Sequence, residues 1–394
     1  MYKIATLNKI SPVGLGRLTN DYEITENISE ACGILVRSQD MLEMEFSPSL
    51  LGIARAGAGV NNIPLTRCAE EGIVVFNTPG ANANAVKELV LCAMLADARN
   101  LYDAMHWTNK LSKSGGGDLG ISKSVEKGKG QFAGHELLGK TIGVIGLGAI
   151  GVKVANACEA LGMKVLGYDP FITAKSAHML SADIPYSSDL NAIVAQCDYI
   201  TIHVPASPKT NGLISKEVIS NMKEGAVLLN FSRDKLVDEA AVLAALETGA
   251  LTRYITDFPN DTTIGQPGVM YIPHLGASTE EAEENSASLA VDELMDYIEN
   301  GNIENSVNYP RCSLGKFVTG QGRSRICILN KNVAGVLGDI TGVLAKMNIN
   351  IANMINSNAG DFAYTMIDTD TEVDATALTS QMSMSGIIRV RVIK

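Results

Sequence analysis

The sequence predicts an α/β protein with two doubly wound, parallel-sheet domains and a small α+β domain of order βαββαβ. Short buried strand candidates alternate with helical segments over most of the chain. A glycine-rich turn at 146–151 joins one such strand to a helix, and residues 325–394 carry four strand and two helix candidates of their own. We predict one domain at 1–96 with 286–310, an inserted domain at 97–285, a linker at 311–324 and the small domain at 325–394.

The composition is that of an ordinary globular protein. Of the 394 residues 46% are hydrophobic, and the formal net charge is −11. An acidic balance argues against nucleic-acid partners and against an anionic membrane, because both need a basic surface. We expect neither a membrane span nor a signal peptide. The seven cysteines show no metal-ligand spacing, so we expect no metal, reduced core thiols and a cytoplasmic location.

Two arginines follow strand candidates of the first domain. We predict these parallel strands at 2–6, 33–36, 52–54 and 73–76. Arg37 and Arg55 stand where strands leave the sheet, which is where open α/β sheets bind ligands. After Arg55, small residues let backbone N–H groups approach a carboxylate: Ala56, Gly57, Ala58 and Gly59. A solvated loop charge is the alternative for both arginines. Beside two glycines, Arg55 is interpreted as substrate-binding, whereas both interpretations stay open for Arg37.

A packed helix and a basic insert come next. Apolar residues between 86 and 94 share one helix face, and Lys87 on another face serves either substrate or solvent. Residues 107–134 carry several lysines, among them Lys113, and a run of three glycines at 115–117. This composition is typical of a solvated loop; the alternative is an arm that reaches a partner subunit.

The glycine-rich turn predicts a dinucleotide site. It follows a strand candidate at 141–145 and opens a helix. Gly146 permits a tight turn, Gly148 lets the backbone approach a pyrophosphate, and Gly151 lets helix and strand pack closely. The helix N-terminus adds free N–H groups and a partial positive charge. Alone, the motif would equally fit a glycine-rich turn in another α/β protein.

An acidic residue ends the next strand candidate and selects the cofactor. Asp169 follows the run 164–168 and can accept hydrogen bonds from both ribose hydroxyls of an adenosine. It would repel a 2′-phosphate, and no arginine occurs at 170–173. The sequence therefore predicts NAD in preference to NADP.

Later strand candidates of the inserted domain end in polar residues. With the two already described they complete a six-stranded parallel sheet: 199–203, 226–230, 253–256 and 269–272. Arg233 and His274 lie just beyond two of these strands. Above a nicotinamide, Arg233 would polarise the 2-oxygen of a hydroxy acid and His274 would take its hydroxyl proton. The alternative for His274 is a core histidine bonded to backbone, and His203 is either structural or lines the cofactor.

These motifs resemble the D-2-hydroxyacid dehydrogenase family over nearly the whole chain. The resemblance rests on the 146–151 turn, Asn230-Phe-Ser-Arg233, Pro273-His-Leu-Gly-Ala-Ser-Thr279 and Arg55-Ala-Gly-Ala-Gly-Val-Asn-Asn62. It implies Arg233 and His274 as catalytic residues. It also implies the following cofactor-binding residues: Gly146, Gly148, Ala149, Ile150, Gly151, Asp169, His203, Pro205, Ser232, Asp257, His274 and Gly276.

The chain departs from the family at the carboxylate that orients the histidine. The family pattern Asp-Val-Phe-x-x-Glu-Pro is replaced by Asp257-Phe-Pro-Asn-Asp261. Asp261 stands at the offset of the glutamate and is our catalytic carboxylate, although its side chain is shorter by one bond, about 1.5 Å. Aligning on Asp257 instead would put Thr262 in that place. Asp234 also stands where the family usually has glycine.

Residues 325–394 resemble an ACT domain, a small-molecule sensing module that often pairs its sheets between subunits. The resemblance implies L-serine as effector, bound by Asn332 and Asn350. The alternative for Asn332 is a helix N-cap. Ala334-Gly335 replaces the usual Pro-Gly, and Asn330 occupies a position where histidine is common.

The resemblance implies NAD-dependent oxidation of 3-phospho-D-glycerate to 3-phosphohydroxypyruvate, the first step of L-serine synthesis, by a homodimer or homotetramer. Arg55 is the first candidate for the substrate phosphate, joined by Arg37, Lys87, or Lys129 of the partner subunit. One alternative is a dehydrogenase for another 2-hydroxy acid, of the glycerate/glyoxylate type. Two others are a non-catalytic NAD-binding regulator and a C-terminal domain that serves only oligomerisation.

Overall fold

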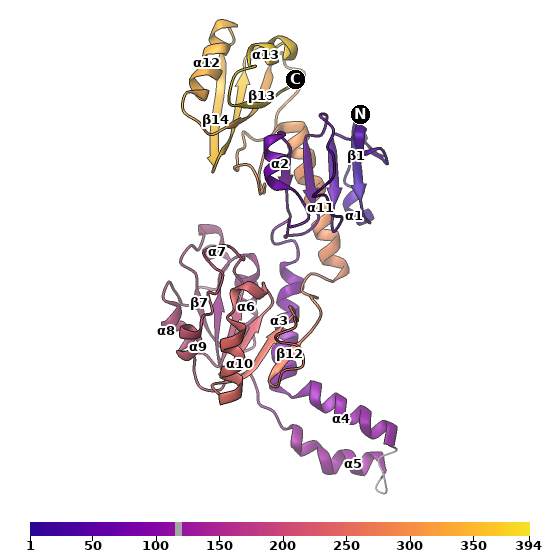
Figure 1. Cartoon of the computed structure of the whole chain (residues 1–394), viewed down its shortest axis with the longest axis vertical. Coiled ribbons are helices and arrows are strands. Elements are labelled where there is room, and N and C mark those ends of the chain that lie inside the picture. Colours follow the sequence, from indigo (N-terminus) through magenta and orange to yellow (C-terminus); the bar gives the residue numbers. More distant parts are fainter. Residues whose placement is uncertain (115–119) are drawn as a thin grey trace. The chain divides into compact units, whose positions relative to one another are not determined.

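The computed structural model describes residues 1–114 and 120–394 and divides into two compact units. The first unit combines Met1–Ala81 with Glu280–Lys394, and the second is Asn82–Thr279 (Figure 1). These divisions lie at 81/82 and 279/280, whereas the sequence places the limits of the inserted domain at 97 and 285. Among the described residues no helix is both long and apolar enough to cross a membrane.

The first unit is built on a five-stranded parallel sheet in the order β2-β1-β3-β4-β5. Its strands are β1 (Tyr2–Leu7), β2 (Tyr22–Thr25), β3 (Gly33–Val36), β4 (Gly52–Arg55) and β5 (Val74–Phe76). The four predicted strands are confirmed. Strand β2 was not predicted, because it is a short and largely exposed edge strand without an apolar run.

Three helices accompany this sheet: α1 (Pro12–Leu15), α2 (Leu65–Glu70) and the long α11 (Glu280–Asn300). Helix α11 packs on β3, β4 and β5 and crosses α1 closely. At that crossing a Cβ on Gly14 would lie 2.5 Å from the Cβ of Ala287, so only glycine fits there. The apolar stripe of α11, including Val291 and Leu294, completes the core under the sheet.

The described residues of the second unit form seven parallel strands in the order β12-β11-β10-β9-β6-β7-β8. They are β6 (Thr141–Ile145), β7 (Lys164–Tyr168), β8 (Tyr186–Ser187), β9 (Tyr199–Ile202), β10 (Ala226–Asn230), β11 (Leu251–Thr256) and β12 (Val269–Tyr271). Six were predicted; the additional β8 has only two residues, too few for a periodic pattern. The strand order reverses between β6 and β9, and such switch points are where doubly wound sheets bind ligands.

The connections of the second unit are helical. The helices are α3 (Ala83–Ala98), α4 (Leu101–Ser114), α5 (Ile121–Gly128), α6 (Ala149–Ala160), α7 (Ala174–Met179), α8 (Leu190–Val194), α9 (Lys216–Ser220) and α10 (Glu239–Thr248). Helices α3 and α6 pack against each other through Val90 and Met94 on α3 and Val154 on α6, in one apolar cluster. The core of the unit therefore lies directly beneath the glycine-rich turn.

The prediction of a loop at 107–134 is wrong, because this segment contains α4 and α5, drawn as two helices in Figure 1. Lys110, Lys123 and Lys127 are exposed on these helices, and the composition alone could not distinguish such a helix surface from a loop. The Trp107 ring packs 5.4 Å from the Phe132 ring and fills the space beside Gly128, where a Cβ would approach it to 2.4 Å. The glycines at 115–117 and the side chain of Lys113 lie outside the described residues.

The C-terminal domain has the predicted order βαββαβ. Its elements are β13 (Ser324–Lys331), α12 (Val336–Lys346), β14 (Ile351–Ala359), β15 (Phe362–Thr369), α13 (Ala375–Gln381) and β16 (Ile387–Ile393). The antiparallel sheet has the order β14-β15-β13-β16. One face packs on α12 and α13 through residues such as Ile328 and Ile340. The other face, including Leu329 and Met366, joins the core of the first unit.

Side chains of this sheet bind the carbonyls at the C-terminal end of α11. Arg391 donates to the carbonyls of Tyr297 and Ile298, and the Tyr364 hydroxyl donates to Gly301 O at 2.7 Å. Arg325, which is 1% exposed, donates to Asn300 O at 2.9 Å. Helix ends leave their last carbonyls unpaired, so the sheet supplies the C-cap of α11.

Candidate active site

The glycine-rich turn between β6 and α6 has three glycines in three distinct environments. Gly146 has φ +95°, and a Cβ there would lie 2.7 Å from the carbonyl oxygen of His203 at the end of β9. A Cβ on Gly151 would lie 1.8 Å from Gly146 O, so helix and turn are in direct contact. A Cβ on Gly148 would meet nothing within 4 Å. This open side is the one from which a ligand can approach the backbone.

Helix α6 begins at this open position without a capping side chain. Gly148 is the N-cap and provides no side-chain acceptor for the first N–H groups, which include those of Ala149 and Ile150. Uncapped N–H groups at a helix start, together with the helix dipole, favour an anion. The turn therefore fits the pyrophosphate of a dinucleotide.

Asp169 is fixed at the carboxyl end of β7 by two backbone amides. Its Oδ2 accepts from Leu147 N at 2.9 Å, and its Oδ1 accepts from Phe171 N at 2.8 Å. Each carboxylate oxygen can accept a second hydrogen bond. The side chain thus stays beside the glycine-rich turn with acceptor capacity for ribose hydroxyls.

Arg233 lies in a turn that Asn230 organises after β10. The Asn230 side chain donates to Arg233 O at 2.9 Å and accepts from Ser232 N at 3.1 Å. The Ser232 hydroxyl donates to Ile202 O at 2.7 Å, which ties the turn to β9. The Arg233 guanidinium donates to Ser232 O at 2.6 Å, and this contact leaves most of its donors for an anionic substrate.

The Phe258 ring contacts both Arg233 and His274. Its ring centroid is 4.6 Å from that of the His274 ring and 5.9 Å from the Arg233 Cζ. His274 is exposed, and its backbone N–H donates to Asp257 O at 2.9 Å. The structure therefore brings the two predicted catalytic side chains to one aromatic ring. Sequence reasoning missed Phe258; its position next to Asp257 was the available signal.

Asp257 is a fully buried carboxylate with one unpaired oxygen. Its Oδ2 accepts from Gly276 N at 3.1 Å, and its Oδ1 has no partner among the described residues. Burial raises the pKa of Asp257, while the Gly276 N–H and the charges of His274 and Arg233 oppose that rise. A buried acceptor without a donor fits an N–H group of a bound cofactor, such as a nicotinamide carboxamide.

Asp261 is not joined to His274. Its side chain is exposed, and no hydrogen bond or ion pair links it to the imidazole in the described part of the chain. Asn260 folds this loop by accepting from Thr262 N at 2.9 Å and donating to Glu239 at 2.8 Å. Asp257 is thus the carboxylate whose charge interacts with His274 in this structure.

His203 is buried and neutral. Its Nε2 shares a hydrogen bond of 2.9 Å with the Thr201 hydroxyl, and burial lowers its pKa to about 3. Its Nδ1 has no partner among the described residues. Pro205, the next predicted cofactor contact, accepts from the Thr210 hydroxyl at 2.6 Å. Both residues follow β9, at the switch point that also holds the glycine-rich turn.

In the first unit Arg55 lies over the glycine loop that follows β4. Its Nε donates to Arg37 O at 3.0 Å. Gly57 has φ +151°, and a Cβ there would lie 2.5 Å from the Arg55 Nη1, so this arrangement requires glycine. The Gly57 N–H donates to the Thr78 hydroxyl at 2.8 Å. Among the described residues the N–H groups of Ala58 and Gly59 have no acceptor and can bind an anion.

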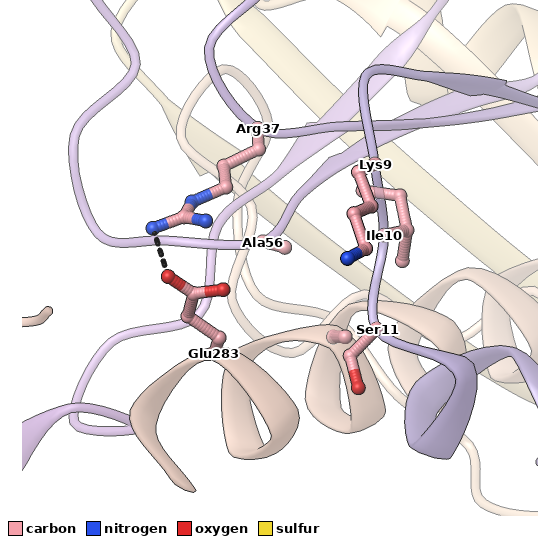
Figure 2. Close-up of a pocket in the computed structure, with 7 residues that line it drawn as sticks. Lys9, Ile10, Ser11, Arg37, Ala56 and Glu283 are labelled. Atoms are coloured by element: carbon pink, nitrogen blue, oxygen red, sulfur yellow. Dashed lines mark ion pairs between the residues drawn. The ribbon is translucent and has the colours of Figure 1, made fainter. Parts of the chain in front are cut away.

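Arg37 forms an ion pair with Glu283 in the first turn of α11. The Nη2–Oε1 distance is 2.7 Å, and Figure 2 shows this contact at the edge of a pocket in the first unit. The predicted substrate residue Lys87 belongs to α3 in the second unit, where its ammonium lies 3.4 Å from Glu88 Oε1. The predicted cations are therefore distributed over both units.

The structure separates Asn332 and Asn350. Asn332 follows β13 and donates to Gly360 O at 3.0 Å, whereas Asn350 precedes β14 and donates to Asp370 Oδ2 at 2.7 Å. Strands β13 and β14 both run antiparallel to β15, so the two asparagines lie at opposite ends of the sheet. Eight residues of strand span about 25 Å. One small effector cannot contact both within a single chain.

Comparisons with known proteins agree with this geometry. The profile described as D-isomer specific 2-hydroxyacid dehydrogenase, NAD binding domain, matches residues 91–276, and that of the ACT domain matches 325–382. The chain is 32% identical to D-3-phosphoglycerate dehydrogenase of Methanocaldococcus jannaschii, covering 98% of this chain and 70% of that protein. It is 30% identical to the same enzyme of Haemophilus influenzae, covering 94% and 88%. Two other curated relatives are longer, and this chain covers 53% and 54% of their length.

A solved structure shows the same likeness. NAD+-bound 3-phosphoglycerate dehydrogenase of Entamoeba histolytica aligns with a TM-score of 0.60 at 26% identity, over 78% of this chain and 98% of that chain. The chain belongs to the D-isomer-specific 2-hydroxyacid dehydrogenase family and carries an ACT domain. Within that family it is an NAD-dependent dehydrogenase, and the predicted fold class is confirmed.

Proposed function

We propose that the protein oxidises 3-phospho-D-glycerate to 3-phosphohydroxypyruvate with NAD, the first step of L-serine synthesis. The observation that carries this proposal is the meeting of Arg233 and His274 at the Phe258 ring, beside the buried Asp257. A guanidinium and an imidazole that lie against the same ring suit the removal of a proton from a hydroxyl next to a carboxylate. The relatives that match most of the chain are named for this enzyme.

Each side chain has a defined part in the reaction. Bound NAD supplies the hydride acceptor. Arg233 binds the substrate carboxylate and polarises the C2 oxygen as it becomes a carbonyl. His274 accepts the C2 hydroxyl proton. A carboxylate would hold its imidazole in the tautomer that can do so. The charge of Asp257 interacts with His274, whereas Asp261 is exposed and would need the loop 258–262 to rearrange.

The substrate phosphate requires cations away from the reacting carbon. Arg55 and Arg37 end neighbouring strands β4 and β3, and the free N–H groups of Ala58 and Gly59 follow them. Arg55 with the 56–59 loop is our first candidate for the anionic end of the substrate. Lys87 and Lys129 of the partner subunit are further candidates.

We also propose that the ACT domain responds to L-serine and that the protein works as a homodimer or homotetramer in the cytoplasm. Since Asn332 and Asn350 lie at opposite ends of one sheet, a single serine would contact Asn332 of one copy and Asn350 of a second copy. Effector binding would then depend on the oligomer.

The test is an assay of the full chain with 3-phospho-D-glycerate and NAD, with and without L-serine. The panel also contains D-glycerate, glyoxylate, a longer phosphorylated hydroxy acid and NADP. Turnover that prefers 3-phospho-D-glycerate with NAD supports the proposal. Preference for glycerate or glyoxylate would assign the second candidate activity, and NAD binding without turnover of any acid would make the protein a regulator.

A further inference from the structure

A small pocket in the first unit combines two cations, a hydroxyl and one carboxylate. It lies where β1 and β3 end and faces the first turn of α11. Arg37 and Glu283 approach each other on one side, and Lys9 and Ser11 line the pocket across from them (Figure 2). Ala56, the residue after Arg55, forms part of the wall. The pocket is thus continuous with the loop that carries the predicted substrate residues.

The charges in this pocket do not balance. Glu283 neutralises Arg37 through the 2.7 Å contact. Lys9 is exposed and has no hydrogen bond or ion pair in the described part of the chain. One positive charge therefore remains without a counter-ion, beside the Ser11 hydroxyl. A compact anion with several acceptor oxygens matches this set of donors.

The Arg37–Glu283 pair is open to exchange. The two side chains are 41% and 45% exposed, and exposed ion pairs contribute little stability. A phosphate dianion carries more charge than a carboxylate and can accept from Arg37 and Lys9. It can therefore displace Glu283 from the guanidinium.

We propose that the substrate phosphate, bound beside Arg55 and its loop, extends into this pocket to Arg37 and Lys9, and that Glu283 is the specificity-determining residue there. In this structure Glu283 pairs with Arg37, and the phosphate takes the place of its carboxylate while Lys9 provides the second cation. Because the carboxylate competes with the substrate, it lowers the affinity for phosphorylated acids. The inference rests on the proposed function, since it takes Arg37 as a phosphate contact.

Displacement of Glu283 also has a consequence for α11. This helix begins immediately after the segment that carries His274 and Gly276. The ion pair joins Arg37, in the loop after β3, to the first turn of this helix. Phosphate binding would release this contact, so occupancy of the pocket would be communicated along the chain toward the histidine.

The test compares Glu283→Gln and Lys9→Gln with the matched control Glu281→Gln, which removes a charge from the same helical turn outside the pocket. For 3-phospho-D-glycerate we expect the KM to fall about 3- to 10-fold in Glu283→Gln and to rise by a similar factor in Lys9→Gln. The KM for D-glycerate should change less than about twofold in each variant, because that substrate has no phosphate. The effect should shrink at high salt.

Inorganic phosphate provides a readout that needs no turnover. Its dissociation constant, measured by calorimetry on the full chain, should change in the same direction and by similar factors in the two pocket variants. A Glu283→Gln variant that binds phosphate no better than wild type overturns the pocket assignment. Failure of wild type to oxidise 3-phospho-D-glycerate would refute the proposed function instead. The phosphate dissociation constants of wild type and the two pocket variants would then still test the pocket as an anion site.

Discussion

His274 and Arg233 are the residues on which the proposed chemistry depends. We predict that His274→Ala lowers kcat by about 10²- to 10⁴-fold, the usual contribution of a general base. NADH binding, followed by its fluorescence, should change little, because the imidazole is exposed and contacts Phe258 rather than the glycine-rich turn. The same kcat in the variant and in wild type would exclude His274 as the base.

The same Asp→Asn change at two positions can identify the carboxylate that orients the His274 imidazole. Asp257 is buried and lies within electrostatic reach of His274, whereas Asp261 is exposed and unconnected to it. We predict that Asp257→Asn lowers kcat about 10-fold or more, because the negative charge near His274 is lost. It should also weaken NAD binding, because the carboxylate oxygen that would accept from the cofactor is changed. Asp261→Asn should change kcat by less than about threefold. The reverse order would show that the 258–262 loop rearranges in the complex.

At the scale of elements, the helix pair α4–α5 depends on one glycine. A Cβ at Gly128 would lie 2.4 Å from the Trp107 ring, while a Cβ at the neighbouring Gly130 would meet nothing within 4 Å. Trp107 is the only tryptophan of the chain, so its fluorescence reports on this contact. We predict that Gly128→Ala shifts the emission to longer wavelength and costs about 1–3 kcal/mol of stability. Gly130→Ala is the control, and equal spectra for both variants would contradict the packing described.

Helix α11 contains a buried carboxyl that makes stability depend on pH. Glu293 is 7% exposed, accepts from the Asn305 amide and leaves its Oε2 unpaired among the described residues. Burial, helped by the nearby Asp292 and Glu304 and opposed by the hydrogen bond from Asn305, raises its pKa from 4.5 to about 7. Between these two values the folded protein binds more protons than the unfolded chain. Stability therefore falls as pH rises from 4.5 to about 7.

Glu293→Gln should remove this dependence. As pH rises through this window, the free energy of unfolding of Glu293→Gln should increase relative to that of wild type. The difference between variant and wild type should be about 2–3 kcal/mol larger at pH 8 than at pH 4.5. Denaturant unfolding at a series of pH values measures the difference. Glu281→Gln, an exposed change on the same helix, should show no such trend, and a pH-independent difference for Glu293→Gln would contradict the burial argument.

The sequence predicted elements well where the signal is local. The glycine spacing at 146–151 and the apolar runs of β6, β9 and β10 depend on neighbours along the chain, and they located the nucleotide turn. The contacts of Glu283 and Arg391 could not be predicted, because their partners come from distant segments. The helices α4 and α5 were missed for another reason: lysine-rich surfaces resemble loops when few apolar positions mark the buried face.

At the scale of the molecule, the ACT domain is attached to the first unit by more than the linker. Its sheet shares an apolar cluster with α11 and the five-stranded sheet. Arg389 donates to the carbonyls of Leu50, Pro48 and Glu71, and Arg391 donates to the end of α11. A change in the ACT sheet would therefore reach the same helix whose first turn carries Glu283.

Arg391 provides the test of this connection. Its guanidinium lies 4.6 Å from the Tyr297 ring centroid and is the donor to two helix-end carbonyls. We predict that Arg391→Leu costs about 2–4 kcal/mol, because buried carbonyls lose a charged donor. Amide exchange should accelerate around residues 297–301, and any response of activity to L-serine should weaken. Arg323→Leu, an exposed change at the start of the same domain, is the control; unchanged exchange at 297–301 in Arg391→Leu would mean that the apolar contacts alone hold the sheet on α11.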